Sequence, residues 1–341
     1  MNKTLPNNRV LSGGFSLVEL MIALVLGLII IGGAGTIFLS NQQAYRTNDG
    51  LSYIQESSRS AFELLAREAR GAGGSACSHF ERVANVVNED PNSPRPWDSA
   101  SMGIQGYDGS MASDGADFGT GIGDRVSGTH AVRFQGMDAS GLSVRDHQTT
   151  SAQLFTNGPN DFKPGEILIV CDLEQASIFQ VTGPNNPGSQ NEVVVHNTGS
   201  SVSPGNCSKG LGYPTVCTTN GTAKEYGENS VIARFNDNLW FIGHNGRTDE
   251  GGRSLYRVDT YGNTQEMVAG VTNLQVTYKR RNQGDWENAS DLSGADWAEV
   301  EAIEVTLTMN SATTRISTNN ANDGRLERQL THVIALRNRL P

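Results

Sequence analysis

The chain places one carboxylate, that of Glu19, at the N-terminal edge of a long uncharged apolar segment. The segment from Leu20 to Leu39 has the roughly 20 residues that an α-helix needs to cross a hydrocarbon core of about 30 Å. A carboxylate inside such a segment costs about 2.5–3.5 kcal/mol, so an ionisable residue there indicates a function. The chemistry open to Glu19 is neutralisation of a cation in an apolar environment.

Cleavage of the chain between Gly14 and Phe15 would create a cation for Glu19. The new α-amino group, with a pKa of about 8, would carry a positive charge one helical turn before the carboxylate. The preceding segment, residues 1–14, contains basic residues and no acid, which is typical of a cytoplasmic leader. We therefore predict that the mature chain begins at Phe15.

The sequence GGFSLVEL at residues 13–20, followed by the apolar segment, resembles the class III leader of type IV prepilins. The resemblance implies cleavage by a prepilin peptidase at Gly14/Phe15, N-methylation of Phe15 and a role of Glu19 in subunit assembly. Two other interpretations are a signal peptide cleaved near residues 33–35 and an uncleaved single-pass anchor. The first has an unusually long apolar region, and the second gives no reason for Glu19.

A helical pattern continues beyond the apolar segment. Apolar residues recur every three or four positions with charged residues between them, at Leu51, Ile54, Ala61, Phe62, Leu65 and Ala69. Because no proline occurs from Phe15 to Asp90, we expect one helix from Phe15 to Arg70, on the order of 80 Å long. Residues 15–39 would be its transmembrane and assembly part, and residues 40–72 its amphipathic continuation on a globular domain.

Glycines interrupt the apolar segment at Gly27, Gly32, Gly33 and Gly35. Each lowers helix propensity by about 1 kcal/mol, so the segment could bend or melt during packing. The alternative is that small residues let neighbouring helices approach closely.

Residues 73–341 have the composition of a β-rich ectodomain, because short β-branched and aromatic runs alternate with turn residues. The predicted fold class is therefore α+β, with the long N-terminal helix packed on a large antiparallel β-rich ectodomain of one or two lobes. Long loops are expected at 91–124 and 184–204. The predicted strands are 131–135, 166–171, 177–182, 192–196, 230–235, 238–242, 254–258, 271–279, 300–309 and 330–337. We interpret 230–235 and 238–242 as a hairpin that turns at Asn236-Asp237.

The four cysteines all follow the apolar segment, on the side opposite the basic leader, where disulfides persist. Cys207 and Cys217 bracket a short glycine- and proline-containing loop, and a bridge there would contribute somewhat under ~3 kcal/mol. That pairing leaves Cys77 for Cys171, although three connectivities are possible. Zinc binding is the alternative, but no CxxC pair is present.

No catalytic, metal or nucleic-acid motif stands out. The histidines form no HExxH pattern, and neither GxSxG nor a phosphate-binding glycine loop occurs. The acidic segment 109–124 could hold calcium, but it lacks the order of an EF-hand loop, so a solvated loop is favoured. A net charge of −10 argues against nucleic-acid binding. We expect no enzymatic activity, no cofactor and no metal.

Five blocks of the chain resemble, in their order, the PilW type of minor pilin. The blocks are residues 167–182, 231–243, 268–278, 301–309 and 333–339. The resemblance implies a bacterial inner-membrane subunit with a periplasmic ectodomain, which primes type IV pilus assembly and stays at the filament tip on the cell surface. It also implies contacts with other minor pilins, the major pilin, the inner-membrane assembly platform and a PilY-type adhesin, and a part in adhesion and twitching motility.

Two alternatives to the PilW resemblance remain open. A type II secretion pseudopilin of the GspJ kind would share the leader, the helix and a β-rich head. A membrane-anchored enzyme or ligand-binding ectodomain could carry a prepilin-like leader. A major pilin fits less well, because those subunits are about half this length and no cysteine follows Cys217.

Overall fold

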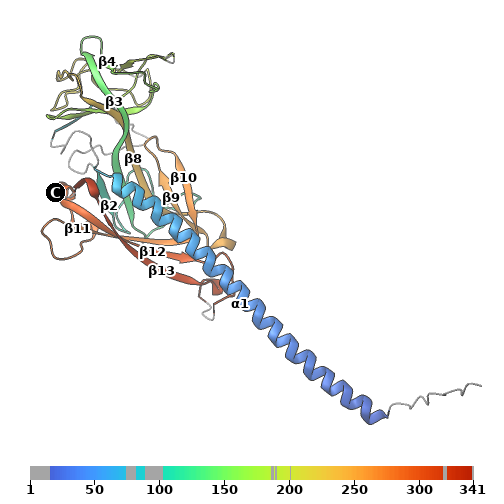
Figure 1. Cartoon of the computed structure of the whole chain (residues 1–341). Helices are drawn as coiled ribbons and strands as arrows, with labels where there is room; N and C mark the ends of the chain where they lie inside the picture. Colours follow the sequence, from blue (N-terminus) through green and yellow to red (C-terminus); the bar gives the residue numbers. More distant parts are fainter. Residues whose placement is uncertain are drawn as a thin grey trace, which may run out of the picture.

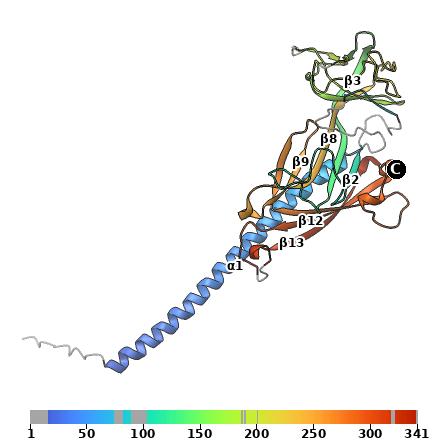
Figure 2. The same ribbon diagram turned by 180° about the vertical axis from the view of Figure 1, so that it is seen from behind.

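The computed structural model describes residues 16–73, 82–88, 103–185, 188, 190–199, 201–317 and 321–339. One long helix, α1, projects from a β-rich head and packs on it with its C-terminal half (Figure 1). The head has two lobes, and both views place the upper lobe beyond the C-terminal end of α1 (Figures 1 and 2). The predicted α+β fold class is confirmed.

Helix α1 runs from Leu17 to Gly71 without interruption. Its C-terminal half buries the apolar stripe expected from the sequence, together with two small residues. The buried residues of α1 are Gly50, Ile54, Ser58, Ala61, Phe62, Leu65, Ala66 and Ala69. The helix ends where Ala72 turns to an extended conformation and its N–H bonds back to the carbonyl of Glu68. Gly73 follows in the left-handed region and donates to Gln135, which ties the end of the helix to the head.

Thirteen strands are present in the described residues, in a ten-stranded sheet and a three-stranded sheet. The strands of the larger sheet are β1 (Val83–Asn85), β2 (Ile104–Tyr107), β3 (Ala131–Gln148), β4 (Gln153–Thr156), β5 (Ile167–Cys171), β6 (Ala176–Gln180), β7 (Val193–Val195), β8 (Val231–His244), β9 (Arg253–Val258) and β10 (Thr264–Ala269). The smaller sheet has the order β11 (Val271–Arg280), β12 (Val300–Asn310) and β13 (Glu327–Ala335). The pairing is antiparallel except that β1 and β6 are parallel.

Short 3-10 helices lie between the strands in the C-terminal part of the chain and after the last strand. Their bounds are Thr248–Glu250, Ala289–Asp291, Gly294–Glu299, Ala321–Gly324 and Arg337–Arg339. The first lies between β8 and β9, and the other four lie between or after the strands of the three-stranded sheet. The last of them brings Asn338 onto the end of α1, where its side chain donates to the Arg70 carbonyl at 3.1 Å.

The antiparallel pair of β3 and β8 runs through both lobes (Figure 2). The predicted hairpin at Asn236-Asp237 is therefore wrong, because both residues lie inside β8 and pair with β3. The Asp237 carboxylate is buried and lies 3.2 Å from the Arg133 guanidinium of the neighbouring strand. This ion pair gives a polar side chain a partner inside the sheet, so tertiary contacts override the local turn preference.

Each lobe has its own apolar core. In the lower lobe, α1 packs on one face of β11–β13 and on β2, β3 and β8, and the core includes Phe62, Tyr278 and Val305. In the upper lobe, β4–β7 and the distal parts of β3 and β8 enclose a second core that includes Phe179 and Tyr226. The head thus adopts the two-lobed alternative, and α1 belongs to the lower lobe.

Candidate functional site on the N-terminal helix

Glu19 lies in the first turn of α1, where the structure begins to describe the chain. The Ser16 side chain caps the helix by accepting the Glu19 N–H at 3.2 Å. A carboxylate in a first helical turn interacts favourably with the helix dipole. The carboxylate of Glu19 makes no ion pair with any residue in the described ranges, and it is exposed. Glu19 is therefore positioned to meet a cation from outside this part of the chain.

The N-terminal half of α1 presents apolar side chains on every face. Each large apolar side chain from Leu17 to Leu39 is between 54 % and 75 % exposed. Among the described residues, α1 is the one helix long and apolar enough to cross a membrane. Because burying one such side chain is worth about 1.5–3 kcal/mol, this half of α1 requires lipid or other apolar helices around it.

The head first contacts α1 just beyond the apolar segment. Gln43 donates to the Ile316 carbonyl at 3.3 Å, and Arg46 donates to the Thr314 carbonyl at 3.1 Å. One turn further, a Cβ at Gly50 would lie 2.6 Å from the terminal methyl of the Ile316 side chain, so a larger residue there would require that side chain to move. These contacts mark the boundary between the free part of α1 and the part fixed to the head.

The glycines of the apolar segment lie within continuous helix. A Cβ at Gly27, Gly32, Gly33 or Gly35 would meet no other described atom within 4 Å. The Thr36 hydroxyl donates to the Gly33 carbonyl at 2.8 Å, a local bond that bends helices slightly. The open space at these glycines is compatible with close approach of another helix, and both interpretations from the sequence remain possible.

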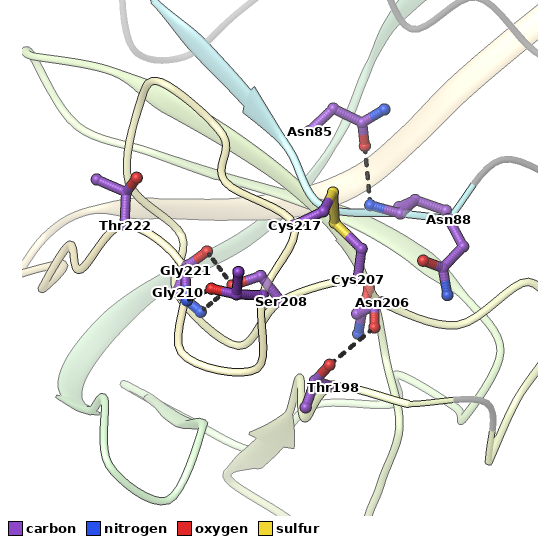
Figure 3. The surroundings of a disulfide bond; sticks show 12 residues. Asn85, Asn88, Thr198, Asn206, Cys207, Ser208, Gly210, Cys217, Gly221 and Thr222 are labelled. Atoms are coloured by element: carbon purple, nitrogen blue, oxygen red, sulfur yellow. Dashed lines mark hydrogen bonds between the residues drawn. A yellow bond between two sulfur atoms is a disulfide. The ribbon is translucent and has the colours of Figure 1, made fainter.

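The three cysteines in the described residues lie in the upper lobe, far from Glu19. Cys207 and Cys217 form a disulfide with a Cα–Cα distance of 4.9 Å, as expected (Figure 3). The loop between them is held at its start, because the Cys207 N–H donates to the Val86 carbonyl at 2.8 Å. Cys171, at the buried end of β5, is also disulfide-bonded, and its expected partner Cys77 lies outside the described residues. Gly14 and Phe15 lie outside them as well.

A cavity of about 400 Å³ lies where α1 ends between the lobes. Its lining combines the basic Arg67 and Arg257 with the acidic Glu68 and Asp138. Burial raises the pKa of Glu68, although a hydrogen bond from Asn238 opposes this effect. Charges of both signs share the cavity, so its lining does not select for an anion or a cation.

The acidic segment 109–124 forms a local hydrogen bond of its own. In it, the Asp124 carboxylate accepts the Gly121 N–H at 2.7 Å.

A buried histidine pair in the upper lobe was missed by the sequence analysis. The Nε2 atoms of His147 and His196 lie 3.1 Å apart, and both side chains are buried. The Tyr226 N–H donates to Nδ1 of His147 at 3.1 Å. That bond leaves the His147 proton on Nε2, from where it bonds to His196. The two histidines lie 49 positions apart in the sequence, so no local motif indicates that they form a pair.

The histidine pair does not have the composition of a metal site. No group of three or more histidine, cysteine or acidic residues suited to a metal occurs in the described part of the chain. In addition, a metal-bound histidine usually donates its second N–H to an acceptor, whereas His147 accepts there. The pair is a polar element of the upper-lobe core.

Comparison with known proteins identifies one motif. The prokaryotic N-terminal methylation motif matches residues 11–35, which include the predicted cleavage site and Glu19. No curated protein and no solved structure matches the chain. The motif and the exposed apolar half of α1 support a pilin-like protein anchored in a membrane. A motif of this kind implies contact with a prepilin peptidase and with a pilin assembly machinery.

Proposed function

We propose that the chain is a minor pilin that primes type IV pilus assembly and occupies the tip of the filament. The observation that carries the proposal is the apolar half of α1, whose large apolar side chains are 54–75 % exposed and which begins with Glu19, a carboxylate that has no ion pair with the described residues. The prokaryotic methylation motif covers most of this half. After cleavage at Gly14/Phe15, the helix is stored in lipid and then transferred into a bundle of similar helices. Each Glu19-type carboxylate then meets an N-terminal ammonium.

The shape of the head supports a terminal position. The upper lobe lies beyond the C-terminal end of α1, at an angle to the helix axis (Figures 1 and 2). In a filament of parallel, staggered helices, that space belongs to the heads of the subunits ahead. A subunit with no neighbour ahead avoids this clash, and its upper lobe is then free to carry a PilY-type adhesin. The proposal includes no enzymatic activity.

The alternative from the same class is a pseudopilin of a type II secretion system. The helix, the methylation motif and a bulky head are compatible with both a pilin and a pseudopilin. The two functions are therefore distinguished by the phenotype of a deletion strain. Deletion of the pilin should abolish surface filaments and leave secretion of folded exoproteins unchanged. Loss of secretion with normal filaments would favour the pseudopilin.

The N-terminus of the mature chain is the first test of the proposal. Mass spectrometry of protein from membranes should find N-methylated Phe15 as the first residue. Gly14→Glu should leave the uncleaved precursor in the membrane. A mature chain that starts at Thr36, or one that retains Met1, would falsify the prepilin interpretation.

The second test asks whether Glu19 acts in assembly. Glu19→Ala and Glu19→Val remove a charge from the apolar helix, so insertion should not fall, whereas entry into filaments should drop about tenfold. The measured quantity is the amount of this subunit in sheared filaments divided by that in membranes. Glu63→Gln is the matched control, because Glu63 is an exposed carboxylate of the amphipathic half of α1 that pairs with Arg59. An unchanged ratio for both Glu19 variants contradicts the assigned role.

A further inference from the structure

The free edge of β13 differs from the other sheet edges in the described residues. Strands β1 and β7 are edges of three residues each, and β2, which pairs with β3 alone, is an edge of four residues. Strand β10 has a register shift between Glu266 and Val268. The free side of β11 is occupied by His130, which bonds to Leu274 and Val276. Strand β13, in contrast, has nine residues, no proline and no bulge. Proteins usually protect such an edge, so an unprotected one indicates strand addition.

The register shows which backbone groups of β13 point outward. The Leu336 N–H donates to the Glu301 carbonyl, and the Ser311 N–H donates to the Leu326 carbonyl. These two pairs belong to the continuous β12–β13 register. In an antiparallel pair the hydrogen-bonded residues alternate, so the backbone N–H and C=O groups of the even-numbered β13 residues between them also point toward β12. The outward groups therefore belong to Glu327, Gln329, Thr331, Val333 and Ala335, which are all exposed. Their N–H groups have no partner within the described part of the chain.

Strand β13 runs in the same direction as α1. Leu326, just before the strand, lies near Gly50 of the helix. His332 packs on Phe62 with a ring-centroid distance of 4.1 Å. Asn338, after the strand, bonds to the Arg70 carbonyl. The edge therefore runs alongside the C-terminal half of α1, from near Gly50 to near Arg70 (Figure 1).

This direction argues against pairing between two copies of the chain. Antiparallel pairing of two β13 edges would point the two α1 helices in opposite directions, whereas subunits of one membrane share their orientation. Parallel pairing would place the two α1 helices on opposite faces of the joined sheet, ~20 Å apart at about 10 Å per layer. Packed helices need interaxial distances of about 8–10 Å. A suitable partner has a free edge strand whose pairing with β13 leaves its own helix parallel to α1 and on the same face of the joined sheet.

We propose that the β13 edge pairs with an extended edge strand in the head of a different pilin-like subunit. The inference rests on the proposed function, because it assumes parallel helices in one membrane. Five residues of β13 supply outward backbone groups, and the Thr331 and Val333 side chains flank the incoming strand on the face away from α1. Main-chain bonds provide affinity, and the shared direction of the helices selects the partner.

A proline at Thr331 tests the edge without removing a backbone bond between β12 and β13. The side-chain bond between the hydroxyls of Thr331 and Thr306, 2.8 Å long, is lost equally in the proline variant and in an alanine control. Thr331→Pro deletes an outward N–H and blocks the incoming strand, whereas Thr331→Ala keeps the N–H. In cells that express the full chain, the proline variant should co-purify about tenfold less of the partner subunit from membranes, and the alanine variant should match the wild type. Equal loss in both variants, or no loss in either, overturns the proposal. Thermal unfolding of the solubilised chains checks that both variants fold.

A photoreactive diazirine amino acid at position 331 tests the identity of the partner, even if the proline variant fails to fold. The expected product joins β13 to the edge strand of another protein with an N-terminal methylation motif. The same probe at Thr306, which lies opposite Thr331 but one strand further in, should give far less product. Crosslinks to a second copy, to lipid or to a protein without the motif overturn the proposal, as does no product from chains present in filaments. Absence of the chain from filaments contradicts the proposed function instead.

Discussion

The buried histidine pair should make the upper lobe sensitive to acid. Burial lowers the pKa of His147 to about 4. Burial and the neighbouring His147 lower the pKa of His196 to about 3. Both groups are therefore neutral in the folded state at neutral pH, whereas in the unfolded chain they titrate near a pKa of about 6.5. The perturbation that tests this arrangement is His196→Gln, which removes one of the two titrating groups.

The sign and size of the effect follow from proton linkage. Below pH ~6.5 the unfolded chain binds protons that the folded lobe does not, so the free energy of unfolding falls as the pH falls. The contribution of the two neutral histidines to the free energy of unfolding is fully present above this pH. It decreases as the pH falls, until the pH reaches the folded-state pKa values of about 4 and about 3. At pH ~5 each histidine costs roughly 2 kcal/mol, so the pair costs roughly 4 kcal/mol. His196→Gln should reduce this acid loss to about half.

Hydrogen exchange of the β5 and β6 amides measures the opening of the upper lobe in the full chain. Their opening free energy should fall between pH 7.5 and 5 by about 4 kcal/mol in the wild type and by about 2 kcal/mol in His196→Gln. His244→Gln changes a histidine of the lower lobe and should behave like the wild type. The reasoning is refuted if the wild type and His196→Gln lose the same free energy, or if nuclear magnetic resonance shows the pair titrating near pH ~6.5.

Two further substitutions test the packing of the two lobes. In the lower lobe, a Cβ at Gly106 would lie 2.0 Å from the hydroxyl oxygen of the buried Tyr278, so Gly106→Ala should lower the free energy of unfolding by about 1–3 kcal/mol. Urea denaturation measures this loss, and an unchanged midpoint would contradict the packing. In the upper lobe, removal of the disulfide with Cys207→Ser/Cys217→Ser should cost somewhat under ~3 kcal/mol. Thermal unfolding measures that cost, and non-reducing peptide mapping that finds Cys207 joined to another cysteine would contradict the pairing.

The helix and its carboxylate could be predicted because their signals are local. Charge-free length, helical periodicity and the absence of proline are all properties of neighbouring residues, so α1 was anticipated almost to its ends. The leader motif is likewise contiguous, and the position of Glu19 in the first turn follows from it. The local disulfide between Cys207 and Cys217 was anticipated for the same reason, since a short loop separates the two residues.

Features that depend on distant residues could not be predicted. Asn236-Asp237 has the composition of a turn, and only Arg133 on β3 explains why Asp237 stays inside a strand. The strand β3 was predicted as residues 131–135, although it extends to Gln148, because its glycines and polar residues weaken the β pattern. The open edge of β13 is equally hidden in the sequence, since the absence of a neighbouring strand is a property of the whole sheet.

The passage of β3 and β8 through both lobes determines how the head bears mechanical load. Within the described residues, a force between the upper lobe and α1 acts along two covalent backbones that pair antiparallel, with one register shift between Ala139 and Leu142. A β-strand already extends about 3.2–3.4 Å per residue, close to the limit of about 3.3–3.6 Å for a stretched chain. The regular parts of the ribbon therefore have almost no elastic reserve while both lobes are folded, and the register shift between Ala139 and Leu142 is the place where it can lengthen. When the upper lobe is pulled, the regular parts of the ribbon therefore move as a unit and pass the pull on to the end of α1, and they do not stretch.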